Sequence, residues 1–186
     1  MFSKFFSYIF PIKVIHQKSE INKSIEITWN NGRLVLDTEN TNYSYGSLQK
    51  VLRKGLKEIG FEKIRKFEKI LILGVAGGSV IKTIVDEINF NGQIIGVEID
   101  SEIIDIANKY FELHKIKNLE IKIADAEKFV ENHTYIYNLI VIDIFQDCLM
   151  PEFLFEEKFF ENVLKILKKN GFILFSQPLK THFLSF

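Results

Sequence analysis

The feature that most constrains the fold is an alternation, from residue 69 onward, between short apolar runs and segments whose apolar residues recur at helical spacing. The runs cover residues 69–74, 93–100, 119–124, 137–143 and 172–176. Apolar strands that alternate with amphipathic helices are typical of βαβ units, whose parallel sheet is covered by helices on both faces. The sequence therefore predicts an α/β domain with a mostly parallel, Rossmann-like sheet. With a helix expected over 46–59, this domain spans residues 46–186.

The first 45 residues have a different pattern and are predicted to form a separate N-terminal arm and β-hairpin region. Residues 24–29 alternate between apolar and polar side chains, and Asn31-Gly32 is a typical two-residue turn into a second strand at 33–37. A further strand is expected at about 11–16. The polar segment TENTNYSY, residues 38–45, is predicted to be a loop.

Composition excludes several classes of function. The 24 basic and 24 acidic residues balance, so no basic surface for nucleic acid is expected. The single cysteine, Cys148, cannot form an internal disulfide and indicates a reducing, cytoplasmic location. The four histidines lack metal-ligand spacing, so no metal site is predicted.

The chain begins with the aromatic segment MFSKFFSYIF. It is too short for an integral membrane segment, which needs about 20 apolar residues, and Pro11 follows it directly. We expect a short helix or extended arm that packs on the domain. The alternative is a peripheral membrane contact, which applies if the rings are left uncovered.

The segment LILGVAGGSV, residues 71–80, places glycines directly after a strand. The dinucleotide pattern G-x-G-x-x-G falls on Gly74, Ala76 and Ser79 and fails at two of its three positions. The G-x-G-x-G pattern common in methyltransferases falls on Gly74, Ala76 and Gly78, with one conservative miss. S-adenosylmethionine is therefore favoured over NAD as the ligand, and a tight strand-to-helix turn with no ligand is the alternative.

Three carboxylates follow the next strands and are expected at the same edge of the sheet, where ligands of such sheets bind. Glu98 is placed to accept hydrogen bonds from ribose hydroxyls, or it is an ordinary solvated side chain at a strand end. Asp125 either accepts from an adenine amino group or caps a helix. Asp143 either acts as a general base or orienting group, or caps a loop.

The chain resembles the spermidine synthase-like branch of the class I S-adenosylmethionine-dependent methyltransferase superfamily in the order and spacing of seven segments. They are NGRLVLD, NYSYGSL, ILILGVAGGS, IGVEID, ADAEKF, NLIVIDIF and NGFILFS. The resemblance runs from about residue 24 to 177. It implies that the ligand is S-adenosylmethionine or its decarboxylated form, with a small-molecule acceptor such as an amine. It also implies the following site: Gly74, Ala76, Gly77 and Gly78 for the methionine part, Glu98 for the ribose, Asp125 with Ala126 for the adenine, Asp143 as catalytic aspartate, and Tyr45 for the amine substrate.

Departures from the family pattern bear on the reaction. Aminopropyltransferases carry an aspartate where this chain has Gly77, and glutamines where it has Gly46 and Thr41. Gln146 also stands where the second aspartate of a D-x-x-D motif is expected. The sequence therefore favours a methyltransferase. The alternatives are a polyamine aminopropyltransferase, a non-catalytic nucleoside-binding protein on the same fold, and, more weakly, an NAD-dependent oxidoreductase.

The chain stops ten residues after the fifth predicted strand, whereas class I methyltransferases continue with a helix and two further strands. The sequence therefore predicts a sheet without those last two strands. Its edge would be uncovered unless the tail or a partner pairs with it, and a homodimer is one way to cover it.

Overall fold

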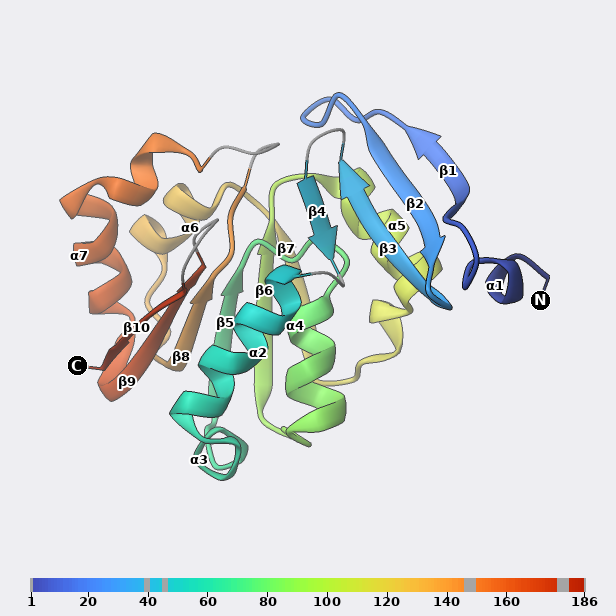
Figure 1. Ribbon diagram of the computed structural model, residues 1–186. Coiled ribbons are helices and arrows are strands. Elements are labelled where there is room, and N and C mark those ends of the chain that lie inside the picture. Colours follow the sequence, from blue (N-terminus) through green and yellow to red (C-terminus); the bar gives the residue numbers. More distant parts are fainter. Residues whose placement is uncertain (1, 39–40, 45–46, 146–149, 177–180, 186) are drawn as a thin grey trace.

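The computed structural model describes residues 2–38, 41–44, 47–145, 150–176 and 181–185. Two sheets organise the described chain (Figure 1). One has four antiparallel strands in the order β1-β2-β3-β4, and the other has six strands in the order β10-β9-β8-β5-β6-β7. The predicted α/β class, with a parallel Rossmann-like sheet after an N-terminal hairpin, is confirmed. The division of the chain into domains at residue 45 stays a prediction.

The N-terminal sheet is built around the predicted hairpin, which is confirmed. Its strands are β1 (Ile12–Gln17), β2 (Ile25–Asn30), β3 (Arg33–Thr38) and β4 (Thr41–Ser44). Asn31 and Gly32 have φ values of 50° and 74°, the left-handed backbone that a two-residue hairpin turn requires. The loop predicted for 38–45 is wrong where β4 pairs with β3. An edge strand forms where a neighbouring strand is available for pairing, so its own residues need not alternate between apolar and polar.

The second sheet contains all five strands predicted for it. β5 (Lys69–Leu73), β6 (Gln93–Glu98), β7 (Leu119–Ile123), β8 (Tyr137–Ile142) and β9 (Leu167–Ser176) are parallel. β5 lies between β6 and β8, so the chain reverses its direction of progress across the sheet there. In open α/β sheets, ligands bind at this switch point, outside the carboxyl ends of the strands.

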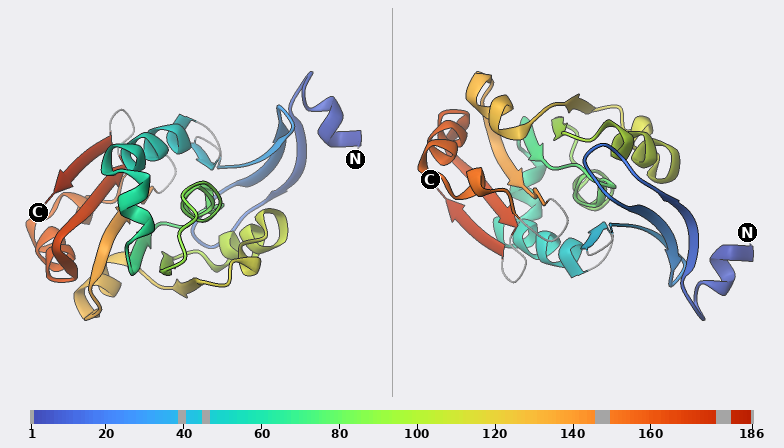
Figure 2. Two further views of the ribbon diagram at one scale, coloured as in Figure 1. Left: turned by 90° about the horizontal axis from the view of Figure 1, so that it is seen from below. Right: turned by 90° about the horizontal axis from the view of Figure 1, so that it is seen from above.

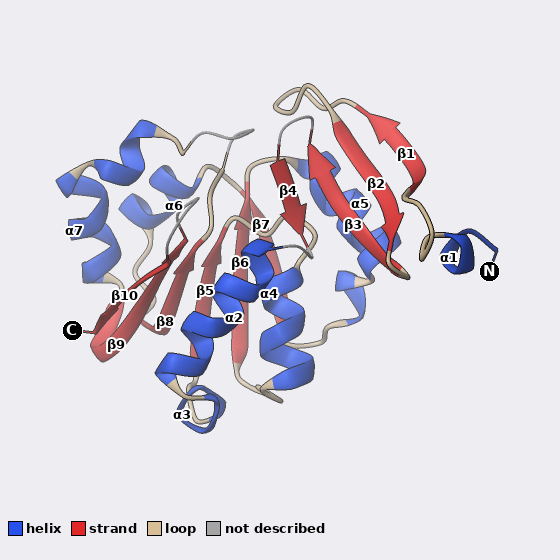
Figure 3. Ribbon diagram, in the orientation of Figure 1, coloured by secondary structure: helices blue, strands red, loops and turns tan. Residues whose placement is uncertain are grey.

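Helices cover both faces of this sheet (Figure 3). α2 (Ser47–Ile59), α3 (Phe61–Arg65) and α4 (Ser79–Lys82), which continues as a π-helical turn over Thr83–Glu87, pack on one face. α6 (Ala126–Asn132), a 3-10 turn at Glu152–Phe155, and α7 (Glu157–Lys165) pack on the other. α7 ends at Lys165, because Leu167 already pairs with Tyr137 as the first residue of β9.

The N-terminal sheet packs against α5 (Ser101–Phe111), which leads through a 3-10 turn (Leu113–Lys115) toward β7. Ile25, Ile27 and Leu36 of the sheet form a buried cluster with Ile103, Ile106 and Phe111 of this helix. This contact places the loop between β1 and β2 above the ends of the parallel strands (Figure 2).

Asp100 fastens that loop to the parallel sheet. Its Oδ1 accepts hydrogen bonds from the backbone N–H groups of Glu102 and Ile103 and so caps α5, while its Oδ2 accepts from Ser19 Oγ and from Asn22 Nδ2, the latter at 2.6 Å. Burial raises the pKa of Asp100, but the hydrogen bonds from Ser19 and Asn22 outweigh it and hold the pKa below its ordinary value. The carboxylate therefore remains ionised, and one side chain serves both a helix and a distant loop.

The C-terminal edge differs from the prediction. β10 (Thr181–Ser185) pairs antiparallel with β9, from Thr181 opposite Ser176 to Ser185 opposite Phe172. The sheet therefore has one strand beyond the fifth, and the chain's own tail covers the edge of β9. From Phe172 to Ser176 the backbone of β9 is therefore paired within the molecule, which protects this part of the edge from pairing with another chain.

The N-terminal segment forms a short helix, α1 (Phe2–Phe6), as predicted. The Tyr8 ring after it lies against Gly32 of the N-terminal sheet, but the Phe2 and Phe5 rings do not pack on the domain. Phe2 and Phe5 are 82% and 72% exposed. Among the described residues, no helix combines the length and the apolar character needed to cross a membrane.

We predict that Asp100→Ala lowers the free energy of unfolding by roughly 2 to 3 kcal/mol, because it removes a helix cap and leaves the Ser19 and Asn22 donors without their acceptor. Since the folded-state pKa is lowered, the loss is expected in full at neutral pH and shrinks as the pH falls below the ordinary value of 3.8. Urea unfolding measures it. Asp105→Ala, at an exposed position on the same helix, is the control. An Asp100→Ala variant as stable as the control would contradict the assignment.

Candidate functional site

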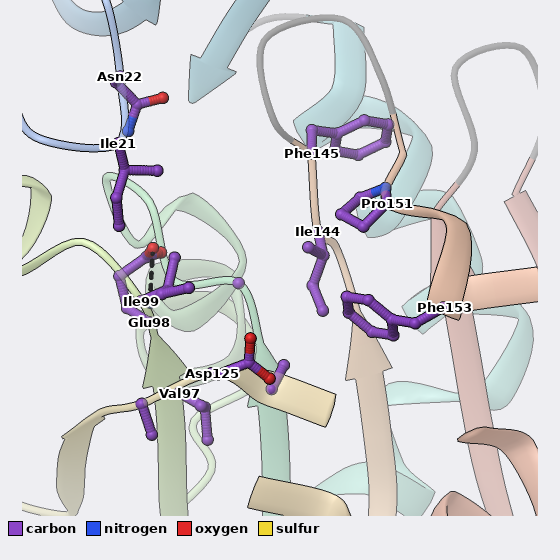
Figure 4. Close-up of a pocket in the computed structure, with 13 residues that line it drawn as sticks. Ile21, Asn22, Val97, Glu98, Ile99, Asp125, Ile144, Phe145, Pro151 and Phe153 are labelled. Atoms are coloured by element: carbon purple, nitrogen blue, oxygen red, sulfur yellow. Dashed lines mark hydrogen bonds between the residues drawn. The ribbon is translucent and has the colours of Figure 1, made fainter. Parts of the chain in front are cut away.

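A cavity of about 170 Å³ opens at the carboxyl ends of β5, β6, β7 and β8 (Figure 4). Gly74, Val97, Glu98, Ala124 and Ile144 line it from the strand ends. Pockets that enclose a whole small ligand usually measure roughly 300 to 1,000 Å³. The described part of this cavity therefore encloses only part of a nucleoside-sized ligand.

The loop between β1 and β2 and the segment after β8 form opposite walls of the cavity. Ile21 and Asn22 lie on one side, and Ile144, Phe145, Pro151 and Phe153 lie on the other (Figure 4). The described residues of the second wall follow β8 and precede α7, whereas Ile21 and Asn22 come from a loop with no sequence signal of its own. They reach the cavity through the hydrogen bonds to Asp100.

Glu98 ends β6 and holds the glycine-containing loop. Its Oε2 accepts hydrogen bonds from the backbone N–H groups of Val75 and Ala76, both at 3.0 Å, and its Oε1 accepts from Ile99 at 3.0 Å and Asp100 at 3.2 Å. Burial raises the pKa of Glu98, and these four hydrogen bonds oppose that rise. A carboxylate has about four acceptor positions, so a ribose would have to replace some of these bonds. Its role in ribose binding stays a prediction.

Asp125 follows β7 and points into the cavity (Figure 4). Its Oδ1 accepts from the backbone N–H of Lys128 at 3.0 Å and caps α6. The helix-cap alternative is therefore correct, but it uses one oxygen of a carboxylate that also lines the cavity together with Ala126, the first residue of α6. The two interpretations of Asp125 are compatible.

The glycine-containing loop contributes less to the cavity than the sequence predicts. Gly74 lines it, whereas Ala76, Gly77 and Gly78 are outside its described lining. Gly74 has a φ of 88°, and a Cβ there would collide with the carbonyl oxygen of Asp143. Gly78, at a φ of 74°, begins α4, and a Cβ there would collide with Leu113. These two glycines are explained by close packing, and ligand binding by Ala76, Gly77 and Gly78 stays a prediction.

Asp143 follows β8 but does not line the cavity. Ile142 and Ile144 pack on the α6–α7 face and Val141 packs on the α2 face, so strand alternation directs Asp143 toward the α2 face. Its Oδ1 and Ser176 Oγ are buried, and neither has a hydrogen-bond partner within the part of the chain that is described. Burial raises the pKa of Asp143 to about 7, the nearby Ser176 hydroxyl lowers it, and the charge of Glu98 raises it further.

Tyr45, which is predicted to hold the amine substrate, lies outside the described residues, as do Gly46 and Gln146. The role of Tyr45 therefore stays a prediction. The strand order does bring β8 and β9 side by side, so the sequence-distant Ser176 lies next to Asp143. Sequence analysis had no signal for Ser176.

The charged side chains in the described lining are Glu98 and Asp125. No lysine, arginine or histidine is among the described residues that line the cavity. The carboxyl group of Asp143 is near enough to Glu98 for its pKa to be raised by the Glu98 charge, so acidic side chains gather at this edge of the sheet. It suits a ligand that carries positive charge.

We predict that Asp143→Asn removes a pH dependence of stability. The folded-state pKa of about 7 lies above the ordinary value of 3.8, so the folded protein binds more protons between these values and its stability falls as the pH rises through them. The variant is expected to exceed the wild type in unfolding free energy by roughly 2 to 4 kcal/mol at about pH 8 and to match it at about pH 4. Denaturant unfolding across this range measures the difference. Parallel curves for the two proteins would show that Asp143 is not a group with a raised pKa.

Comparison with known proteins gives relatives of two kinds. The polyamine aminopropyltransferase of Hamiltonella defensa is 28% identical over 109 residues, which are 56% of this chain and 37% of that protein. A crystal structure of spermidine synthase in complex with the transition-state analogue AdoDATO has a TM-score of 0.71 at 19% identity, covering 88% of this chain and 57% of that one. Human methyltransferase-like protein 13 in complex with SAH has a TM-score of 0.60 at 22% identity, covering 70% of this chain and 64% of that one.

These relatives confirm the spermidine synthase-like class I methyltransferase fold that the motifs predict. The chain spans less than two fifths of the length of the aminopropyltransferase. The family model for the spermine/spermidine synthase domain matches residues 49–184, which is well over half of the chain. The chain therefore belongs to the spermine/spermidine synthase domain family.

Proposed function

We propose that the chain binds a nucleoside of the S-adenosylmethionine type in the cavity and transfers an aminopropyl group from the decarboxylated form to an amine. The acidic lining carries this proposal. S-adenosylmethionine has a carboxylate that needs a cation or N–H donors, whereas the decarboxylated form and an amine acceptor are both cationic. A lining that holds Glu98 and Asp125 and no basic side chain among the described residues favours the cationic pair. The family and its named aminopropyltransferase relative support the same reaction.

The residues present fit such a nucleoside. Asp125 and Ala126 lie where an adenine amino group could be accepted, between the apolar walls of the cavity. Glu98 would exchange some of the hydrogen bonds that it accepts from backbone N–H groups of neighbouring residues for bonds to a ribose. The backbone from Gly74 to Gly78 would border the chain attached to sulfur. The bound nucleoside would supply a carbon made electrophilic by the sulfonium.

Asp143 is suited to accept the proton that the acceptor amine must lose. An amine attacks only in its neutral form, and its ammonium must first lose a proton. A carboxyl group with a pKa of about 7 is partly ionised near neutral pH, which is the condition for an effective general base. Because Asp143 lies outside the described lining of the cavity, this role requires the acceptor amine to bind on the α2 side of the strand ends. Ser176, buried beside Asp143, would orient the carboxyl.

Methyl transfer is the second candidate, and Gly77 is the observation that favours it. Aminopropyltransferases carry an aspartate at this position in the resemblance described above, and glycine offers no carboxylate to hold the amine of the decarboxylated nucleoside. S-adenosylmethionine itself needs no such group. The acceptor, the homodimer and the cytoplasmic location also stay predictions.

Calorimetry with the decarboxylated nucleoside, S-adenosylmethionine and NAD, followed by product analysis, tests the proposal. We expect the decarboxylated form to bind most tightly and turnover with a diamine to release 5′-methylthioadenosine. Release of S-adenosylhomocysteine would establish methyl transfer instead. Binding without turnover of either nucleoside, with a range of amine acceptors, would assign a non-catalytic nucleoside-binding role.

We predict that Asp125→Asn weakens nucleoside binding roughly 10-fold to 100-fold, the range for a lost hydrogen bond to a charged group. Asparagine is as good a helix cap as aspartate, so α6 keeps its cap, while an amide donor replaces a carboxylate oxygen in the cavity. Calorimetry gives the affinity, and thermal unfolding should show little change. Asp105→Asn, exposed on α5, is the matched control. Unchanged affinity in Asp125→Asn would leave Asp125 with the helix cap alone.

A further inference from the structure

Six apolar side chains at the N-terminus are exposed together, and we call them the N-terminal patch. Phe2, Phe5, Tyr8, Ile9 and Phe10 are 82%, 72%, 63%, 75% and 54% exposed, and Phe6 is 44% exposed. They come from α1 and the turn after it, which project from one end of the molecule (Figure 2). A gathering of large apolar side chains on a protein surface marks a site of interaction.

The backbone that carries the N-terminal patch is anchored to the β2–β3 hairpin. Ser7 is buried; its carbonyl oxygen accepts a hydrogen bond from the Asn31 N–H at 2.9 Å, and its Oγ accepts one from the Gly32 N–H at 3.0 Å. The Lys4 ammonium lies over the Trp29 ring, 5.8 Å from its centre. The helix is therefore fixed against the sheet, and the Tyr8 ring lies against Gly32 of the hairpin turn. Phe2 and Phe5 face outward.

The basic residues of the N-terminal segment that lie near the patch are Lys4 and Lys13. Residues 1–19 contain no aspartate or glutamate, although the whole chain has no net charge, and their third lysine, Lys18, lies in the loop at the other end of β1. Lys13 forms an ion pair with Glu26 at 2.6 Å, whereas Lys4 lies within α1 itself. Exposed rings next to a lysine side chain are complemented by a surface that is both apolar and anionic. A bilayer with anionic headgroups is such a surface.

The position of the patch leaves the cavity accessible. α1 lies at the Asn31 end of the β1–β2 hairpin, while Ile21 and Asn22 of the cavity lie in the loop at its other end. A bilayer could therefore cover the patch without closing the cavity. A helix of five residues is far too short to span a bilayer and would lie in its interface, where aromatic side chains are favoured.

We propose that the N-terminal patch binds this chain to the surface of a membrane that contains anionic lipids, with the rings of α1 and its turn inserted at headgroup depth and Lys4 beside the headgroups. The proposal does not depend on the reaction that the cavity performs.

Co-sedimentation of the full chain with vesicles tests it. We expect binding to phosphatidylcholine–phosphatidylserine vesicles, weaker binding to pure phosphatidylcholine vesicles, and a decrease with added salt. Phe5→Ala and Ile9→Ala should each weaken vesicle binding roughly tenfold, since each removes an apolar side chain from the interface. Lys4→Glu should weaken binding to the anionic vesicles more than binding to the neutral ones.

Leu164→Ala, which shortens an exposed apolar side chain on α7, is the matched control and should bind vesicles as the wild type does. All of these side chains are exposed, so thermal unfolding should be nearly unchanged. Absence of binding to the anionic vesicles, or equal binding by wild type and the patch variants, would overturn the proposal. A dimer in light scattering that Phe5→Ala dissociates, without vesicle binding, would assign the patch to a second copy of the chain instead.

Discussion

The carboxylate of Glu98 is the interaction on which the candidate site depends most. It stands at the end of β6 and binds four backbone N–H groups, two in the loop after β5 and two at the start of the turn into α5. Those N–H groups would otherwise be unpaired where a strand gives way to a helix, and leaving such groups unpaired is costly. One buried side chain thus sets the shape of the loop beside the cavity and the direction in which the chain leaves β6.

Asp100, two residues later, extends this arrangement to the N-terminal sheet. By capping α5 and accepting hydrogen bonds from Ser19 and Asn22, it brings a loop from a separate sheet to the edge of the cavity. The apolar cluster between the sheet and α5 holds the two together by packing, and the hydrogen bonds to the buried Asp100 carboxylate position the loop. Binding at the cavity and attachment of the N-terminal sheet are therefore physically linked through two neighbouring acidic residues. The N-terminal patch lies at the far end of the same sheet.

Much of the fold could be predicted because each element carries its own periodic pattern. The five parallel strands are continuous apolar runs, and Asn31-Gly32 is a turn of well-defined backbone geometry. β4 and β10 were not predicted, since edge strands depend on a neighbouring strand and hardly on their own composition. In the site, Glu98, Asp125 and Ala126 line the cavity as expected. Asp143 is not among the residues that line the cavity; strand alternation at the end of β8 directs its side chain toward the α2 face.

The sequence by itself determined the class of fold, the family and the edge of the sheet at which chemistry-bearing residues gather, because these follow from local periodicity and from residues that succeed strands. Only the tertiary structure decided which of those residues share a cavity. Ile21, Asn22 and Ser176 are far in sequence from the residues they join, and it is sheet order and helix packing that bring them there. The same holds for the glycines. The motif that contains Gly74 and Gly78 suggests ligand binding, whereas the structure explains both glycines by the close approach of neighbouring chain segments.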